Sequence, residues 1–345
     1  MDDLRAAIIG YGLAGQAFHG PLIAATPGLA VAAVLTRDPG RQEQAGREHP
    51  AARVVASVEE VWAAEPDFVV VVAPNDLHVP LARAALDRDL AVVVDKPLAP
   101  TAEGGKALVE HARARGRPLT VFHNRRWDSD QLTLRRLLAE GPLGDVLRYE
   151  SRFERWRPDL GADAKAWRDL AGAPAGGVHL DLGPHLVDQA LTLFGPPARV
   201  YGEIGFVRGG ADDDFFVAMQ HRSGVTSHLW ASAVAAAPGP RLRVLGTAGA
   251  YVVQELDGQE DALRAGRRPD DGEPWGVEPP KRWGRLVRGT EAEPVPSERG
   301  RWPRFYGLWE RALHGDGPVP VEPEDAVAGL QVLDAVARGA TVDFA

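Results

Sequence analysis

Short apolar runs alternate with segments of helical spacing through the first part of the chain. The runs are Ala6–Ile9, Val31–Leu35, Phe68–Val72, Ala91–Val94 and Leu119–Phe122. Runs that are β-branched or apolar at every position are typical of strands buried on both faces of a parallel sheet. Residues 79–87 and 102–115 have helical spacing. The pattern predicts an α/β fold that begins with a doubly wound parallel sheet and right-handed crossovers.

The second part of the chain changes to a period of two. In residues 147–154, Leu, Tyr, Ser and Phe alternate with Arg and Glu, which predicts a strand with one polar face. Further strands are expected at Val200–Val207, Phe215–His221, Val225–Ser232, Arg241–Leu245 and Ala250–Glu255, and helices at Gln131–Glu140 and Leu186–Phe194. The close spacing favours a large open, mostly antiparallel sheet. We expect the uncovered face of such a sheet to join subunits of a homodimer or homotetramer.

We divide the chain into two domains, residues 1–121 and residues 122–345. A last amphipathic helix, Pro323–Arg338, is expected to pack back near the first domain. Residues 256–303 are polar and rich in Pro, Gly and Trp, with little periodicity. A stretch of this length is either a functional loop or an ordered insertion.

Composition narrows the class of protein. The net charge of −9 argues against a nucleic-acid or anionic-membrane partner, and no apolar run approaches the roughly 18 residues of a spanning helix. The absence of Cys excludes disulfides, thiolate catalysis and Cys-ligated metals, and we expect no metal. The acidic N-terminus leads directly into the first strand without a signal peptide, so a cytoplasmic protein is expected.

The first strand runs into the glycine-rich hexapeptide Gly10-Tyr11-Gly12-Leu13-Ala14-Gly15, which opens a segment that can be helical, Gln16 to Ala25. Strand, glycine turn and helix are the context in which this spacing indicates dinucleotide binding. Gly10 permits the tight turn, Gly12 lets the backbone approach a pyrophosphate, and Gly15 lets the helix pack close to the strand. The free N–H groups of the helix then face the phosphates. The alternative is an ordinary turn between strand and helix.

The end of the second strand bears on the choice between NADP and NAD. Enzymes that use NAD usually place Asp or Glu there, to bind the ribose 2′-OH. This chain has Thr36 and Arg37, whose hydroxyl and guanidinium could hold a 2′-phosphate. The sequence therefore favours NADP, although Asp38 keeps NAD open. The alternative for Arg37 is a solvated loop arginine.

Polar residues follow the later strands of the first sheet. Ala73-Pro74-Asn75-Asp76-Leu77-His78 and Asp95-Lys96-Pro97 come at the carboxyl ends of strands, where such folds bind ligands. Lys96 is one of four lysines, and partial burial would make it a tunable acid or hydrogen-bond donor. The alternatives are that Asn75 or Asp76 caps the next helix, that His78 packs against that helix, and that Lys96 is a surface residue.

A second informative stretch is Val178-His179-Leu180-Asp181-Leu182-Gly183-Pro184-His185. Asp181 just before Pro184 indicates a helix start, so Asp181 and His185 would share one side of its first turn. The positive end of a helix disfavours the protonated form of a histidine. A neutral imidazole is what a general base for an alcohol proton requires. The alternatives are a helix cap for Asp181 and a packed histidine for His185.

These segments together resemble the Gfo/Idh/MocA oxidoreductases over nearly the whole chain. The resemblance lies in Gly10 to Gly15 with Phe18 to Leu22, Pro74 to His78, Asp95-Lys96-Pro97, Trp167-Arg168 and Asp181 to His185, with Asp95 where the family usually has Glu. Within the family, residues 123–128 and 258–266 are similar to the NADP-dependent scyllo-inositol 2-dehydrogenases. The resemblance implies an N-terminal Rossmann domain that binds NADP or NAD, and a C-terminal domain for substrate binding and oligomerisation.

The resemblance also implies functions for individual residues. Lys96, Asp181 and His185 would be catalytic. Cofactor contacts would come from Gly10, Tyr11, Gly12, Leu13, Ala14, Gly15, Thr36, Arg37, Ala73, Pro74, Asn75, His78, Asp95, Lys96, Asn124, Trp167 and Arg168. Substrate contacts would come from Lys96, His123, Arg125, Asp181 and His185.

The implied reaction is hydride transfer between a nicotinamide and a secondary alcohol or ketone of a cyclitol or sugar, with His185 as base and Lys96 as donor to the substrate oxygen. Two alternatives stay open. One is an oxidoreductase for another carbohydrate, such as a keto- or anhydrosugar. The other is a nucleotide-binding sensor without turnover.

Overall fold

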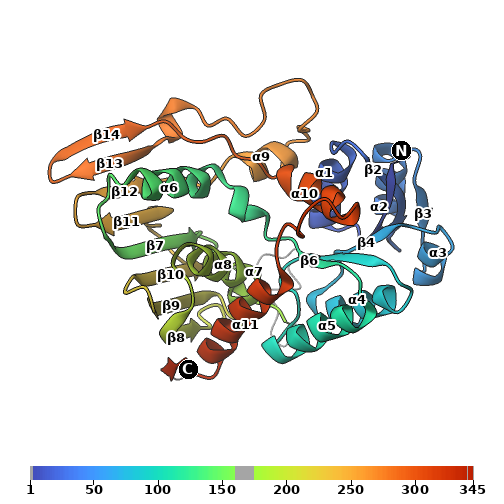
Figure 1. Cartoon of the computed structure of the whole chain (residues 1–345), viewed down its shortest axis with the longest axis horizontal. Helices are drawn as coiled ribbons and strands as arrows, with labels where there is room; N and C mark the ends of the chain where they lie inside the picture. The colour runs from blue at the N-terminus through green and yellow to red at the C-terminus, as the bar shows by residue number, and fades with distance from the viewer. Residues whose placement is uncertain (1–2, 160–174, 340, 345) are drawn as a thin grey trace.

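The computed structural model of the chain describes residues 3–159, 175–339 and 341–344. The first of its two sheets has six strands in the order β3-β2-β1-β4-β5-β6 (Figure 1). They are β1 (Leu4–Ile9), β2 (Leu29–Leu35), β3 (Arg53–Val55), β4 (Phe68–Val71), β5 (Ala91–Val94) and β6 (Leu119–Val121). All neighbouring pairs are parallel, so the predicted parallel sheet is confirmed. The short edge strand β3 was not predicted, because its three residues are too few to show a period.

Helices connect these strands. They are η1 (Ala14–His19), α1 (Gly20–Ala24), α2 (Pro39–Glu48), α3 (Val58–Trp62), η2 (Asn75–Leu77), α4 (His78–Leu86) and α5 (Ala102–Arg115). The helix expected from Gln16 starts two residues earlier, and its first part, η1, is π-helical. The strands β4 and β5 are buried at every position, as their continuous apolar runs predict.

The second sheet has nine strands in the order β14-β13-β12-β11-β7-β10-β9-β8-β15. They are β7 (Val146–Glu154), β8 (Pro197–Gly205), β9 (Asp214–His221), β10 (Thr226–Ser232), β11 (Leu242–Gly246), β12 (Ala250–Val253), β13 (Gly284–Arg288), β14 (Glu291–Val295) and β15 (Val342–Asp343). The pair β7–β10 is parallel and the other pairs are antiparallel. The prediction of a large, mostly antiparallel sheet is confirmed.

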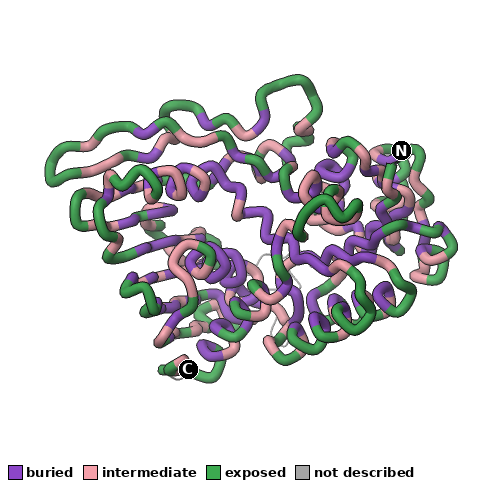
Figure 2. Tube along the Cα trace, in the orientation of Figure 1, coloured by how far each residue is buried: buried purple, intermediate pink, exposed green. Residues whose placement is uncertain are grey.

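The second half of the chain also carries eight described helical segments. They are η3 (Asn124–Trp127), α6 (Ser129–Glu140), α7 (Val178–Asp181), α8 (Gly183–Phe194), α9 (Gln259–Arg264), η5 (Pro280–Arg282), α10 (Arg304–Leu313) and α11 (Pro323–Ala337). Helix α8 packs on β7 and β10, while α11 packs on β8, α8 and α5. The last helix therefore contacts both sheets' helical layers, and the buried segments meet where the two halves join (Figure 2). No helix of the described residues is long and apolar enough to cross a membrane.

Residues 256–303 form an ordered insertion with helices and strands of its own. The segment contains α9 and the hairpin β13–β14, which extends the second sheet at one edge. The hairpin escapes a search for apolar alternation because β14 is a polar edge strand that contains Pro294, a residue tolerated only where no ladder hydrogen bond is needed. Two tryptophans flanking the hairpin, Trp275 and Trp302, are fully buried.

Candidate functional site

Of the three glycines in the turn after β1, only Gly12 has open space where a side chain would begin. Gly10 has φ +103°, and a Cβ there would lie 2.6 Å from the carbonyl oxygen of Val72. A Cβ at Gly15 would lie 2.5 Å from the carbonyl oxygen of Gly10, whereas none of the described atoms lies within 4 Å of a Cβ built at Gly12. The turn is therefore closed against the sheet at its ends and open at its middle, where a dinucleotide pyrophosphate fits.

The side chain of Tyr11 points away from this opening. Its ring is buried, and its hydroxyl donates to the carboxylate of Glu48 on α2. Burial, followed by the hydrogen bond to Glu48, raises the pKa of Tyr11 far above its ordinary value. In the turn, Tyr11 therefore has only its backbone to offer to a ligand, and Leu13 is half exposed.

The end of β2 commits Asp38 to a structural function. One carboxylate oxygen of Asp38 accepts a hydrogen bond of 2.9 Å from the backbone N–H of Arg41, so Asp38 caps α2. The neighbouring Arg37 is exposed, and its Nε donates to the carbonyl of Ala56 at 3.1 Å. Thr36 is buried beside it. The residues available to a ribose 2′ substituent at this strand end thus include an exposed guanidinium.

The two loops after β4 and β5 are tied together by His78. Its Nδ1 lies 2.7 Å from the carbonyl oxygen of Pro97, and its Nε2 lies 2.8 Å from that of Ala73. Asn75 in the first loop donates to the carbonyl of Ala175 at 2.8 Å, which joins the loop to the second half of the chain. His78 thus joins the two loops by hydrogen bonds. No side chain of the described residues caps α4, so the alternative of Asn75 or Asp76 as its cap is wrong.

Asp95 is a buried anchor under the same loop. Its carboxylate accepts from the backbone N–H of Lys96 at 2.8 Å and lies 3.8 Å from Nε2 of His19. Burial opposes ionisation of this carboxyl, but the nearby His19, together with Lys96 and His78, outweighs it and lowers the pKa of Asp95 to about 2. The ring of His19 is held in turn by a hydrogen bond of 2.6 Å between Nδ1 and the hydroxyl of Tyr306 on α10.

Lys96 meets Asp181 at the junction of the two halves. The ammonium donates to the carbonyl oxygen of Asp181 at 2.6 Å and to its carboxylate at 2.8 Å. Both side chains are mostly buried, with 13% and 29% of their surface exposed. Asp181 is the last residue of α7 and no side chain caps α8, so the alternative of Asp181 as the cap of that helix is wrong.

His185 lies in the first turn of α8, and none of the described residues provides a hydrogen bond to its Nδ1. Burial is the largest cause that lowers the pKa of His185 well below its ordinary value, and the charges of Lys96 and Arg125 add to it. The imidazole is therefore neutral near pH 7, as the sequence requires of a base. Burial is thus the main cause of the lowered pKa of His185.

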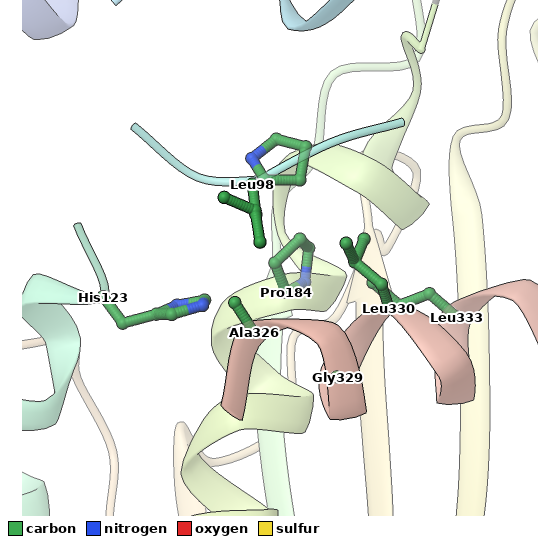
Figure 3. A pocket seen from close by; sticks show the side chains of 8 residues that line it. Leu98, His123, Pro184, Ala326, Gly329, Leu330 and Leu333 are labelled. Carbon is green, nitrogen blue, oxygen red and sulfur yellow. The ribbon is translucent and has the colours of Figure 1, made fainter. Parts of the chain in front are cut away.

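His123 and Arg125 lie on the segment that leaves β6. His123 is buried, with its Nε2 4.0 Å from the carboxylate of Asp188 on α8, and its ring is 6.2 Å from that of His185. Figure 3 shows a narrow cleft beside it, lined by Leu98, Pro184 and residues of α11. Asn124 is buried in η3. Trp167 and Arg168 lie outside the described residues.

Two acidic residues next to this site were not predicted. Asp188 takes a bidentate pair of hydrogen bonds from Arg126, at 2.9 and 2.6 Å, and Glu260 of α9 pairs with Arg125. Asp188 carried a signal, because it is an acid on the inner side of the predicted helix after His185. Glu260 lies in residues 258–266, where the sequence is similar to the inositol dehydrogenases, but that similarity indicated no function for it.

Comparison with known proteins shows the family of this chain. Residues 4–123 match the model of an oxidoreductase family with an NAD-binding Rossmann fold, so the protein is an NAD(P)-dependent dehydrogenase by class. Residues 131–252 match the GFO/IDH/MocA C-terminal domain. The chain belongs to the Gfo/Idh/MocA oxidoreductase family, as the sequence predicts.

Three relatives illustrate the similarity. The chain is 40% identical to the uncharacterized oxidoreductase YdgJ of Escherichia coli, over 96% of this chain and 95% of that protein. It is 34% identical to scyllo-inositol 2-dehydrogenase (NADP⁺) IolW of Bacillus subtilis, over 97% and 93%. The solved structure of oxidoreductase YvaA from Bacillus subtilis superposes with a TM-score of 0.91 at 33% identity, covering 100% of this chain and 99% of that one.

Proposed function

We propose that this dehydrogenase uses NADP to transfer hydride to or from a secondary alcohol or ketone of a cyclitol or sugar, of the scyllo-inositol type. The observation that carries the proposal is the ion pair of Lys96 with Asp181 beside the buried, neutral His185. The similarity to the inositol dehydrogenase IolW supports the substrate class. The exposed Arg37, with Asp38 engaged as a helix cap, supports NADP over NAD.

In this proposal the cofactor supplies the hydride acceptor or donor at the carboxyl edge of the first sheet. The open position at Gly12 and the N–H groups that begin η1 would hold its pyrophosphate. Arg37 and Thr36 would hold the 2′-phosphate, and the loop of Ala73, Pro74, Asn75 and His78 would line the nucleotide. Asp95 and Asn124 would support the nicotinamide end.

Three residues would handle the proton of the substrate hydroxyl. His185 would accept that proton at its unprotonated ring nitrogen, which is available because the imidazole is neutral. The ammonium of Lys96 would donate a hydrogen bond to the same substrate oxygen and stabilise negative charge that develops there. Asp181 orients the ammonium through the hydrogen bond of 2.8 Å and would accept from a neighbouring substrate hydroxyl.

We further propose that two or four copies associate through the uncovered face of the second sheet. Tyr201, Phe216 and Trp230 form a row of rings on three neighbouring strands, with centroids 6.4 and 5.2 Å apart. Tyr201 is 44% exposed. An aromatic row across a sheet face is a suitable core for a symmetric contact.

The first experiment measures oxidation of NADPH and of NADH with a keto-inositol, for the natural chain, His185→Ala and Arg37→Ala. We expect loss of His185 to lower kcat by about 10²–10⁴, and loss of Arg37 to raise KM for NADPH while leaving KM for NADH unchanged. Arg47→Ala, on the exposed side of α2, is the control for the second effect. Near-normal turnover of His185→Ala would refute the base assignment, and NADH preference in the natural chain would refute the cofactor assignment.

A further inference from the structure

The guanidinium of Arg125 is enclosed by protein groups. One terminal nitrogen pairs with the carboxylate of Glu260, and the other lies 3.5 Å from that of Asp128. Its central carbon lies 4.9 Å from the ring centroid of Phe153 and 5.5 Å from that of Trp302. Only 6% of Arg125 is exposed. A cation held on its edges and its faces has a fixed position, and the low dielectric around it lets its charge act on neighbours.

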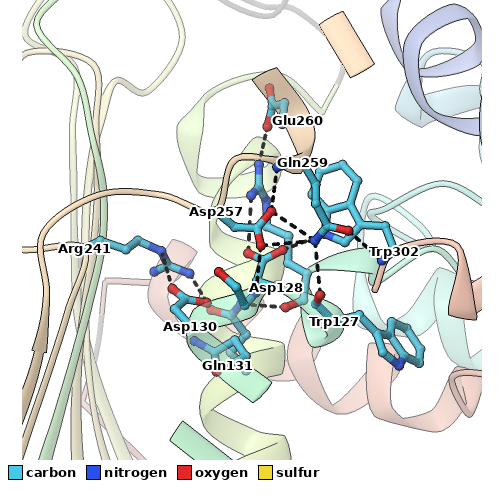
Figure 4. A network of polar contacts seen from close by, with 12 residues as sticks. Trp127, Asp128, Asp130, Gln131, Arg241, Asp257, Gln259, Glu260 and Trp302 are labelled. Atoms are coloured by element: carbon cyan, nitrogen blue, oxygen red, sulfur yellow. Dashed lines mark hydrogen bonds and ion pairs between the residues drawn. The ribbon is translucent and has the colours of Figure 1, made fainter. Parts of the chain in front are cut away.

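Of the groups around Arg125, Glu260 and Trp302 belong to the insertion at residues 256–303 and Asp128 is held by it (Figure 4), whereas Phe153 lies on β7. Gln259 is the central residue: its side-chain oxygen accepts from the indole of Trp275 at 2.9 Å and the backbone N–H of Trp302 at 2.8 Å. Its amide nitrogen donates to Asp257 at 3.0 Å and to the carbonyl of Trp127 at 3.2 Å. Every hydrogen-bonding direction of this buried amide is used, so its position is determined.

The same network fixes the carboxylate on the other edge of Arg125. The indole N–H of Trp302 donates to Asp128 at 2.7 Å, and Asp257 accepts from the backbone N–H of Ser129 at 2.7 Å. Glu260, the residue after Gln259, is only 18% exposed at its side chain and divides its two oxygens between Arg125 and Arg264. The insertion therefore provides one ion-pair partner of Arg125 and holds the other in place.

Arg125 reaches the proposed base through a shared ring. His185 contacts the ring of Phe153 at a centroid distance of 6.2 Å, and Arg125 lies over this ring at 4.9 Å. The charged or titratable groups that face His185 are Lys96 with its partner Asp181, His123, Arg125 and Arg241. Arg241 lies over the same ring at 4.3 Å and is 3.3 Å from Asp130. Two paired cations thus lie behind the imidazole.

We propose that Glu260 and Gln259 are positioning residues of the active site, which hold Arg125 behind His185 and so make the insertion part of the catalytic apparatus. This proposal rests on the role proposed above for His185. It gives residues 256–303 a function: the charge of Arg125 disfavours an imidazolium, and Glu260 moderates that charge. The substrate oxygen then meets a histidine that is ready to accept its proton.

The test is the pH dependence of kcat/KM from about pH 4.5 to pH 9 for oxidation of an inositol with NADP, the direction in which His185 must be unprotonated to accept the hydroxyl proton. Arg125→Met removes a positive charge near His185, so the acidic limb is expected to move to higher pH by about 0.5–1 unit. Glu260→Gln leaves the charge of Arg125 less neutralised, so the limb is expected to move to lower pH. Arg125→Lys restores the charge and is expected to bring the limb back toward its natural position.

The matched control is Glu255→Gln, which removes an exposed ion pair with Arg282 just before the insertion and is expected to leave the profile unchanged. Shifts of the acidic limb in opposite directions in Arg125→Met and Glu260→Gln support the proposal. Loss of folding or packing would instead move the acidic limb of both variants in the same direction. Equal shifts, or none, overturn it. If Arg125→Met does not fold, Arg125→Lys and Glu260→Gln decide the question. An unaltered profile in His185→Ala would instead refute the proposed function.

Discussion

Two glycines of the cofactor turn should respond to alanine in opposite ways. At Gly10 an alanine would have φ +103° and a Cβ 2.6 Å from the carbonyl oxygen of Val72. The backbone conformation alone costs roughly 1–3 kcal/mol, and the clash with a strand carbonyl adds to it, so Gly10→Ala should lower the free energy of unfolding by several kcal/mol. At Gly12 the space around a Cβ is open within 4 Å among the described residues, so Gly12→Ala should fold with unchanged stability.

The defect of Gly12→Ala should appear only in the stabilisation that the cofactor provides. At a concentration of 100 times Kd, a ligand stabilises the fold by about 2.7 kcal/mol, as RT ln(1 + [L]/Kd). If the new methyl group weakens binding about 100-fold, the same NADPH concentration stabilises Gly12→Ala by only about 0.4 kcal/mol. The assay is thermal or urea unfolding of the natural chain and both variants, each with and without NADPH.

A clear result would refute this reasoning. If Gly12→Ala gains as much stability from NADPH as the natural chain does, the dinucleotide does not approach the turn at this position. If Gly10→Ala is as stable as the natural chain, the turn does not need the positive φ of +103° at this position. Gly46→Ala on α2, where a Cβ also meets open space, serves as a control for the general effect of replacing glycine in a helix.

Three further outcomes are expected. Lys96→Met should lower kcat by about 10²–10⁴ with little change in NADPH affinity, and turnover near the natural rate would contradict a donor at this position. Burial raises the pKa of Asp212 to about 6, so the ionised carboxylate destabilises the fold above about pH 6, and this penalty disappears below about pH 4. The free energy of unfolding of Asp212→Asn, measured in urea, should therefore rise relative to that of the natural chain by up to about 3 kcal/mol between pH 4 and pH 7. A difference in unfolding free energy that does not change with pH would contradict this. Trp230→Glu should convert the proposed oligomer to monomers in sedimentation velocity, and an unchanged mass would show that another surface joins the subunits.

Much of the fold could be predicted because its signals are local. The strands β4 and β5 are continuous apolar runs, β7 alternates with a period of two, and the glycine turn lies directly after β1. These patterns need no knowledge of distant residues. The hairpin β13–β14 was missed for the opposite reason, because it is stabilised by its pairing with β12 rather than by an apolar face of its own.

The candidate site could be predicted only in parts. The partners Lys96 and Asp181 are 85 residues apart, and Arg125 and Glu260 are 135 apart, so no local spacing connects them. The resemblance supplied Lys96, Asp181 and His185 as a set. It gave no reason for the neutrality of His185, which comes from burial by residues of several distant segments.

The charge balance of the site gives Asp181 a greater importance than orientation alone. Lys96 and Arg125 both oppose protonation of His185, and each is paired with a carboxylate from a different segment, Asp181 or Glu260. Removing the carboxylate of Asp181 takes from the mostly buried Lys96 its ion-pair partner, and such a loss is far more destabilising than the pair was stabilising. Asp181→Asn should therefore displace the ammonium of Lys96 as well as weaken substrate binding. Because Lys96 and Arg125 are both paired with carboxylates, the total charge around the buried His185 remains small.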